Sequence, residues 1–132
     1  MSKIHTLASY IPLWIQVTRL DRPIGWMVLL WPTWIALTLA GFSANEFKPD
    51  TWVIFTLGVI ITRSAGCVIN DLTDRKFDKN VKRTQARPIT TGNLSVKNAV
   101  TVAIILLITA FFLVLQTNQQ TIYVSFIALG LA

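Results

Sequence analysis

Long apolar stretches with almost no charge alternate with short polar segments along this chain. The first stretch runs from Ile24 to Ala44, the second from Trp52 to Asn70 and the third from Asn98 to Leu115. The first and third carry no charged residue, and the second carries only Arg63. An α-helix rises about 1.5 Å per residue and a bilayer core is about 30 Å thick. Each stretch therefore predicts a transmembrane helix.

A fourth apolar stretch starts near Thr121 and continues to Ala132, where the sequence stops. These 12 residues are too few to span a bilayer. A helix cut inside hydrocarbon would leave backbone groups without hydrogen-bond partners. We therefore expect residues 1–132 to be the N-terminal part of one membrane-embedded domain, completed by further C-terminal helices of the same protein. The predicted fold class is all-α, a polytopic transmembrane helix bundle in contact with membrane lipid.

Charged residues gather in the connections, and their signs predict the orientation. Residues 71–97 carry seven Lys or Arg against three Asp, whereas residues 116–120 carry no charge and residues 46–50 carry two acids and one Lys. The N-terminal segment carries three basic residues against Asp21 before the first stretch. Because basic loops stay in the cytoplasm, we expect the N-terminus and the 71–97 segment to be cytoplasmic.

The composition supports a membrane protein and argues against a nucleic-acid partner. Hydrophobic residues make up 53% of the chain and charged residues only 14%, against roughly 25% in soluble domains. The net charge of +6 is better explained by membrane orientation and anion binding than by nucleic acid, given the apolar stretches. The lone Cys67 cannot form an internal disulfide and matches no metal-site spacing.

Three carboxylates follow the second apolar stretch at helical spacing. If the helix continues, Asp71, Asp74 and Asp78 lie on one stripe at i, i+3 and i+7, with Asn70 at its edge. Carboxylates that close repel one another, and a divalent cation reverses the penalty. Mg²⁺ takes oxygen ligands, often one or two carboxylates together with substrate phosphates. The stripe thus predicts a Mg²⁺–diphosphate site at the membrane surface.

Ion pairing is the alternative explanation of these acids. Asp71 can pair with Arg75, and Asp78 with Lys82, each at i, i+4. The basic residues downstream favour the diphosphate site, because they can bind phosphate oxygens that the metal does not reach. Pro and Gly residues in the same segment predict a loop that covers the site. The candidate diphosphate-binding residues are Lys82, Arg83 and Arg87.

Three other arginines are candidates for binding an aromatic acid or for a structural role. Arg63 lies inside the second stretch, seven residues before Asn70 and on the same helix face. An ionisable residue inside a span indicates function, and an interhelical salt bridge is the equal alternative. Arg19 and Arg22 precede the first stretch, where a guanidinium can hold a carboxylate with two hydrogen bonds or simply anchor the helix.

These motifs resemble the UbiA superfamily of intramembrane prenyltransferases. The first Asp-rich motif of that family, N-D-x-x-D-x-x-x-D, is matched in full by the four residues that begin at Asn70. The family often continues with R-T-x-x-R-P, which is intact from Arg83 to Pro88. The longer strings RSAGCVIND and RLDRP are most similar to the 4-hydroxybenzoate branch.

The resemblance implies nine transmembrane helices around a central cavity, of which this chain supplies the first three to four. It implies a Mg²⁺-dependent aromatic prenyltransferase that moves a polyprenyl group from polyprenyl diphosphate to the ring of 4-hydroxybenzoate in ubiquinone biosynthesis. The expected location is the bacterial inner (plasma) membrane, and Asp71, Asp74 and Asp78 take the catalytic, metal-binding role. A second Asp-rich motif is expected in a later cytoplasmic loop, so this chain alone is expected to be inactive.

Other functions remain open from the sequence. The acceptor can be another one, such as a haem, a naphthoate or a homogentisate. A membrane CDP-alcohol phosphotransferase is also Asp-rich, but it needs Gly and Ala-Arg after its second Asp, where this chain has Arg75 and Lys76. A non-catalytic membrane subunit is the third alternative, and it predicts no Mg²⁺-dependent diphosphate binding.

Overall fold

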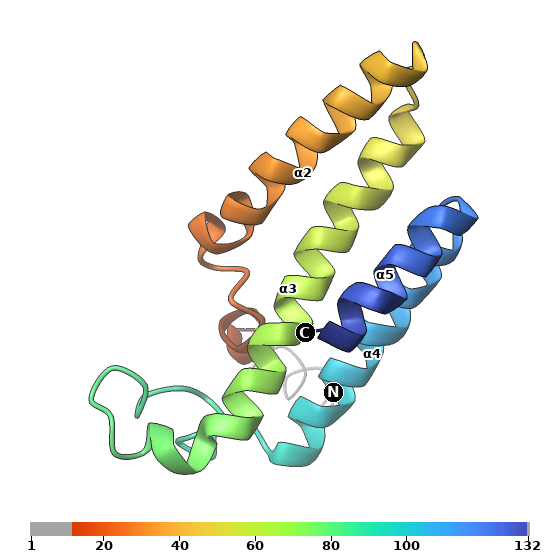
Figure 1. Ribbon diagram of the computed structural model, residues 1–132. Coiled ribbons are helices and arrows are strands. Elements are labelled where there is room, and N and C mark those ends of the chain that lie inside the picture. The colour runs from red at the N-terminus through yellow and green to blue at the C-terminus, as the bar shows by residue number, and fades with distance from the viewer. Residues whose placement is uncertain (1–11, 132) are drawn as a thin grey trace, which may run out of the picture.

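The computed structural model describes residues 12–131, and these residues form helices and connecting turns without a strand (Figure 1). Residues 12–18 are helical. The helices that follow are α2 (Pro23–Ala44), α3 (Pro49–Asp78), α4 (Val96–Leu115) and α5 (Gln119–Leu131). By length and composition, α2, α3 and α4 can each cross a membrane. The predicted fold class, an all-α bundle with several spans, is confirmed.

Local chemistry explains where these helices start and stop. Both α2 and α3 begin with proline, whose fixed φ suits the first helical turn and whose missing N–H needs no partner there. The N-cap of α4 is Ser95, whose side chain accepts a hydrogen bond from the backbone N–H of Asn98 at 3.2 Å. Asn45 ends α2 in the left-handed conformation, a common way to close a helix.

The third helix is longer than a membrane requires. With 30 residues, α3 extends for about 45 Å, against about 30 Å of hydrocarbon. Its apolar part ends near Asn70, and the helix continues to Asp78, so the three acids lie on helical turns beyond the apolar part. The non-helical connection to α4 is therefore limited to residues 79–95.

The buried core lies at this end of α3. It joins the helical segment 12–18, α3, the 79–95 connection and α4, through Val17, Val68, Ile89, Leu94, Ala99, Val102 and Ala103. Small alanines allow α4 to approach α3 closely. Because Ile89 and Leu94 are anchored in this core, the connection is held against the last turns of α3. Elsewhere most large apolar side chains are exposed, as suits lipid contact.

Candidate functional site

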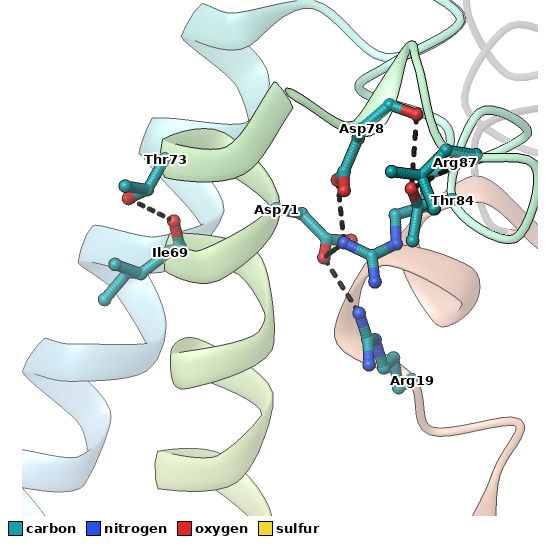
Figure 2. Close-up of polar contacts among 8 residues, drawn as sticks. Arg19, Ile69, Asp71, Thr73, Asp78, Thr84 and Arg87 are labelled. Carbon is teal, nitrogen blue, oxygen red and sulfur yellow. Dashed lines mark hydrogen bonds and ion pairs between the residues drawn. The ribbon is translucent and has the colours of Figure 1, made fainter. Parts of the chain in front are cut away.

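Two acids of α3 and two distant arginines form one network, which we call the acid–arginine cluster (Figure 2). Arg19 Nη2 donates to Asp71 Oδ1 at 2.9 Å. Arg87 Nη1 lies 2.9 Å from the same Oδ1 and 2.7 Å from Asp78 Oδ2. One guanidinium group therefore bridges two carboxylates that are seven residues apart on the helix.

Burial makes this pairing necessary. Asp71 is 2% exposed and Asp78 is 6% exposed. A buried carboxylate without a partner is strongly unfavourable, because it loses its hydration and gains nothing in return. Two guanidinium groups balance the two carboxylates in charge, and neither arginine is fully buried, so their remaining N–H groups can reach solvent or an anion.

The turn that follows α3 carries Arg87 back over the acids. The buried Thr84 hydroxyl donates to the backbone carbonyl of Asp78 at 3.2 Å. The N–H of Arg87 donates to the carbonyl of Thr84 at 3.0 Å, and the N–H of Thr91 donates to the carbonyl of Arg87 at 2.9 Å. These bonds fold residues 79–91 into consecutive turns. Thr84, which the sequence did not single out as a site residue, is thus the tie between Arg87 and α3.

Arg19 reaches Asp71 from an unusual backbone conformation. Its φ is 55°, in the left-handed region that a non-glycine residue seldom adopts. The N–H of Leu20 donates to Ile15 O and that of Arg19 to Gln16 O, the bond pattern that closes a helix and normally has glycine at this position. An arginine here costs backbone strain. Its ion pair with Asp71 offsets that cost.

A polar pocket of about 500 Å³ opens beside the cluster. Two of its arginines, Arg22 and Arg83, are exposed, and neither forms an ion pair with an acid of α3. Its lining residues are Gln16, Arg19, Asp21, Arg22, Asp71, Arg83, Thr84, Ala86, Arg87 and Pro88. The pocket thus combines four guanidinium groups with two carboxylates, a composition that suits a multiply charged anion.

The other predicted site residues lie outside the cluster. Asp74 and Asn70 are on the exposed side of the same helical turns, and Lys82 is exposed and does not line the pocket. The i, i+4 alternative paired Asp71 with Arg75. Within residues 12–131, Asp71 instead pairs with Arg19 and Arg87, so that prediction is wrong.

The same correction applies to the second proposed pair, because Asp78 pairs with Arg87 and not with Lys82 in the described part of the chain. The i, i+4 pairs fail because the carboxylates point under the 79–95 connection. Arg75 is half-buried and Lys82 is exposed, and neither forms a salt bridge among residues 12–131.

The donor chemistry of the acids fits a magnesium ion that is shared with a phosphate ligand. No three His, Cys, Asp or Glu side chains among residues 12–131 lie close enough to hold a metal by themselves. Mg²⁺ seldom needs such a cage, since one or two carboxylates, substrate phosphates and water complete its shell. In their ion pairs with the described residues, Asp71 and Asp78 each use one carboxylate oxygen. The second oxygen of each is left to coordinate a metal ion.

Arg63 lies apart from the cluster, in an apolar groove of about 440 Å³ between α2, α3, α4 and α5. Leu29, Pro32 and Thr62 also line this groove. Arg63 makes no salt bridge within the part of the chain that the structure describes, so the predicted interhelical ion pair is not formed there.

Comparisons with known proteins agree with one another. The model of the UbiA prenyltransferase family matches residues 29–132. The chain is 50% identical over 124 residues to the 4-hydroxybenzoate octaprenyltransferase of Pseudoalteromonas translucida (strain TAC 125), covering 94% of this chain and 42% of that protein. It is 48% identical over 126 residues to the protein of the same name from Vibrio atlanticus (strain LGP32), covering 96% of this chain and 44% of the relative.

A third relative of that name, from Alcanivorax borkumensis (strain ATCC 700651 / DSM 11573 / NCIMB 13689 / SK2), is 51% identical over 125 residues, with 93% of this chain and 42% of the relative covered. The chain thus spans less than half the length of these curated relatives. No solved structure matches it.

Proposed function

Since the chain belongs to the UbiA prenyltransferase family, we propose that its protein transfers a polyprenyl group from polyprenyl diphosphate to the ring of 4-hydroxybenzoate, a step of ubiquinone biosynthesis. The observation that carries this proposal is the pocket where four arginines meet the buried carboxylate of Asp71, whose partner Arg87 also binds the buried Asp78. The names of the relatives support the choice of acceptor.

The arginines of the pocket bind the diphosphate. Arg22 and Arg83 are exposed and line the pocket, so their guanidinium groups are available to phosphate oxygens. Arg87 is already fixed over the acids and can share its remaining N–H donors with the same ligand. Lys82, exposed on the same connection, adds positive charge that attracts the anion.

The acids of α3 bind Mg²⁺ through oxygen. The candidate ligands are Asn70, Asp71, Asp74 and Asp78. Because no three acids among residues 12–131 converge on one point, diphosphate oxygens and water would have to supply the other ligands of the ion. When bound, the ion supplies positive charge that stabilises the diphosphate as it leaves. Arg19 and Arg87 hold Asp71 at the pocket, and Arg87 also fixes the carboxylate of Asp78.

The chemistry is a substitution at the allylic carbon of the prenyl group. The bond between this carbon and the diphosphate oxygen breaks, and its electron pair leaves with the diphosphate. The arginines stabilise the negative charge that develops there. The ring carbon ortho to the hydroxyl group of the acceptor forms the new carbon–carbon bond and then loses its proton. The groove lined by apolar residues keeps water from the allylic cation.

Arg63 is the residue that holds the carboxylate of the acceptor. Of the three arginines considered for this role, Arg19 is engaged by Asp71 and Arg22 lies in the polar pocket. Arg63 lies in an apolar groove, where an aromatic ring also gains by leaving water. It precedes Asp71 by eight residues, about 12 Å along the helix axis, which leaves room for the ring between the guanidinium and the diphosphate.

The charges of the connections support an orientation with the N-terminus and the 79–95 connection in the cytoplasm, across a bacterial inner membrane. Polyprenyl diphosphate then reaches the pocket with its tail in lipid and its head group at the cytoplasmic surface. Membership of the family argues against the CDP-alcohol phosphotransferase alternative.

The proposal is tested with membranes that contain the protein. Labelled polyprenyl diphosphate and 4-hydroxybenzoate should give a prenylated acid that disappears with EDTA and returns with added Mg²⁺. A panel with naphthoate, homogentisate and haem checks the acceptor. Absence of Mg²⁺-dependent product with every acceptor, together with no Mg²⁺-dependent binding of the diphosphate, would favour a non-catalytic subunit and end the proposal.

A further inference from the structure

Gly25 of α2 lies against the guanidinium of Arg63 of α3. A Cβ atom built on Gly25 would lie 2.7 Å from Nη2, 3.0 Å from Nε and 3.2 Å from Cζ of Arg63. Carbon and nitrogen atoms do not pack at the first of these distances. A side chain at position 25 would therefore displace the end of the flexible Arg63 side chain, which is the part that can move most easily. The guanidinium of Arg63 therefore occupies the space that a side chain at position 25 would fill.

A glycine in the first turn of a helix otherwise has a cost. Gly25 is the third residue of α2, two positions after the initiating proline, where alanine would favour the helix more. The φ of Gly25 is not in the positive range, so its backbone conformation does not call for glycine. The structure therefore explains Gly25 by the space that the guanidinium of Arg63 needs.

The seat of Arg63 also has no negative partner nearby in α2. The first turn of α2 contains no acidic residue, and no side chain of residues 12–131 caps its N–H groups. The positive end of the helix dipole therefore adds to the charge of the guanidinium rather than neutralising it. An anion is the partner that both features favour.

We propose that Gly25 is a positioning residue, which leaves open the space where the guanidinium of Arg63 lies and from which it can bind the carboxylate of the aromatic acceptor. This inference rests on the proposed function, and it adds that the acceptor site depends on a missing side chain on α2. Gly25 itself touches no reacting atom.

A double-mutant cycle with Gly25→Ala and Arg63→Ala tests the inference in membranes that contain the protein. Gly25→Ala should raise KM for 4-hydroxybenzoate about tenfold or more, the loss expected for a charge-assisted hydrogen bond, with little change in KM for polyprenyl diphosphate. In the Arg63→Ala background the same substitution should have almost no further effect, because the guanidinium is gone. Equal effects in both backgrounds, or a change in KM for the diphosphate alone, would overturn the proposal.

Gly66→Ala is the matched control, since Gly66 is also helical and no atom of the part of the chain that the structure describes lies within 4 Å of a Cβ built there. It should leave both KM values unchanged while Gly25→Ala does not. Loss of acceptor binding in Gly66→Ala as well would show that these helices simply tolerate no alanine, and would contradict the specific role of Gly25.

A second measurement does not depend on prenyl transfer. Phenylglyoxal modifies accessible guanidinium groups, and mass spectrometry of the peptides reports the extent at Arg63. Gly25→Ala should change the modification rate of Arg63, and 4-hydroxybenzoate should slow modification in the wild type much more than in the variant. An unchanged rate would refute the Gly25–Arg63 contact. If the contact is present but no prenyl product forms, only the proposed function fails.

Discussion

The two ends of α3 each lie near an ion pair, and the two pairs are built differently. Before the helix, Lys48 Nζ lies 3.0 Å from Glu46 Oε2, with side chains that are 63% and 57% exposed. After its apolar part, Asp71 and Asp78 are buried under the 79–95 connection and share Arg87. Similar N···O distances thus occur in two environments, one exposed to solvent and one largely buried.

The difference shows what each end is built to do. An exposed pair gains little, because water and salt screen it. A buried cluster depends on every partner, since a carboxylate left alone in a dry place has lost its hydration. The N-terminal end of α3, next to the turn from α2, has aromatic contacts, such as Trp34 with Trp52 and Phe47 with Trp52, which suit a membrane interface. At the C-terminal end of α3 the acid–arginine cluster buries charged groups, which is typical of a site that binds a charged ligand.

The largest effect is expected on turnover, from the acids of the cluster end. Asp74→Ala or Asp78→Ala should abolish prenyl transfer, a loss of at least about 100-fold, because each removes an oxygen donor for the metal. Membrane insertion, measured by membrane fractionation, should be unchanged in both variants. Wild-type turnover in either variant would refute the metal assignment.

These two variants also sharpen the comparison, because Asp74 is exposed and Asp78 is buried. Asp74→Ala should leave the thermal stability in detergent close to that of the wild type. Asp78→Ala should lower it, since Arg87 then loses one of its two carboxylates.

Arg87→Ala should destabilise the protein by about 3–5 kcal/mol, the usual loss when one partner of a buried ion pair is removed. The reason is that Arg87 bridges Asp71 and Asp78 at once. Thermal unfolding in detergent measures this. A loss of stability below about 1 kcal/mol would mean that the cluster is as exposed to solvent as the Glu46–Lys48 pair.

Arg19→Gly should cost about 1–2 kcal/mol, less than the loss at Arg87. It removes the hydrogen bond to Asp71, which is charge-assisted, but glycine relieves the strain of the positive φ at this position. Asn45→Gly is the matched control, because Asn45 also has a positive φ, of 51°, and carries no ion pair of the cluster. It should be neutral or slightly stabilising, and a gain of stability in both variants would contradict a structural role of the Arg19 ion pair.

Lys48→Ala should have the smallest effect, between 0 and about 1 kcal/mol, because its pair with Glu46 is exposed. Raising the salt concentration should remove even this difference. A loss as large as that of Arg87→Ala would break the contrast between the two ends of the helix.

Much of the fold followed from local chemistry that the sequence displays. Apolar stretches with almost no charge predict membrane helices because unpaired backbone groups and charges are costly in hydrocarbon, and the all-α fold class is confirmed. The N-D-x-x-D-x-x-x-D and R-T-x-x-R-P strings indicated the family, and the match to its model confirms this. The metal, diphosphate and acceptor roles of individual residues stay predictions.

The sequence by itself determined the helices and the family, because both depend on residues that are near neighbours in the chain. The partners of the acids on α3 were decided only by tertiary structure. Helical spacing offered Arg75 and Lys82, whereas the folded chain brings Arg19 to Asp71 from 52 residues away and Arg87 to Asp78 from nine. Buried charges are paired by whichever opposite charge the packing delivers, and spacing along one helix does not contain that information.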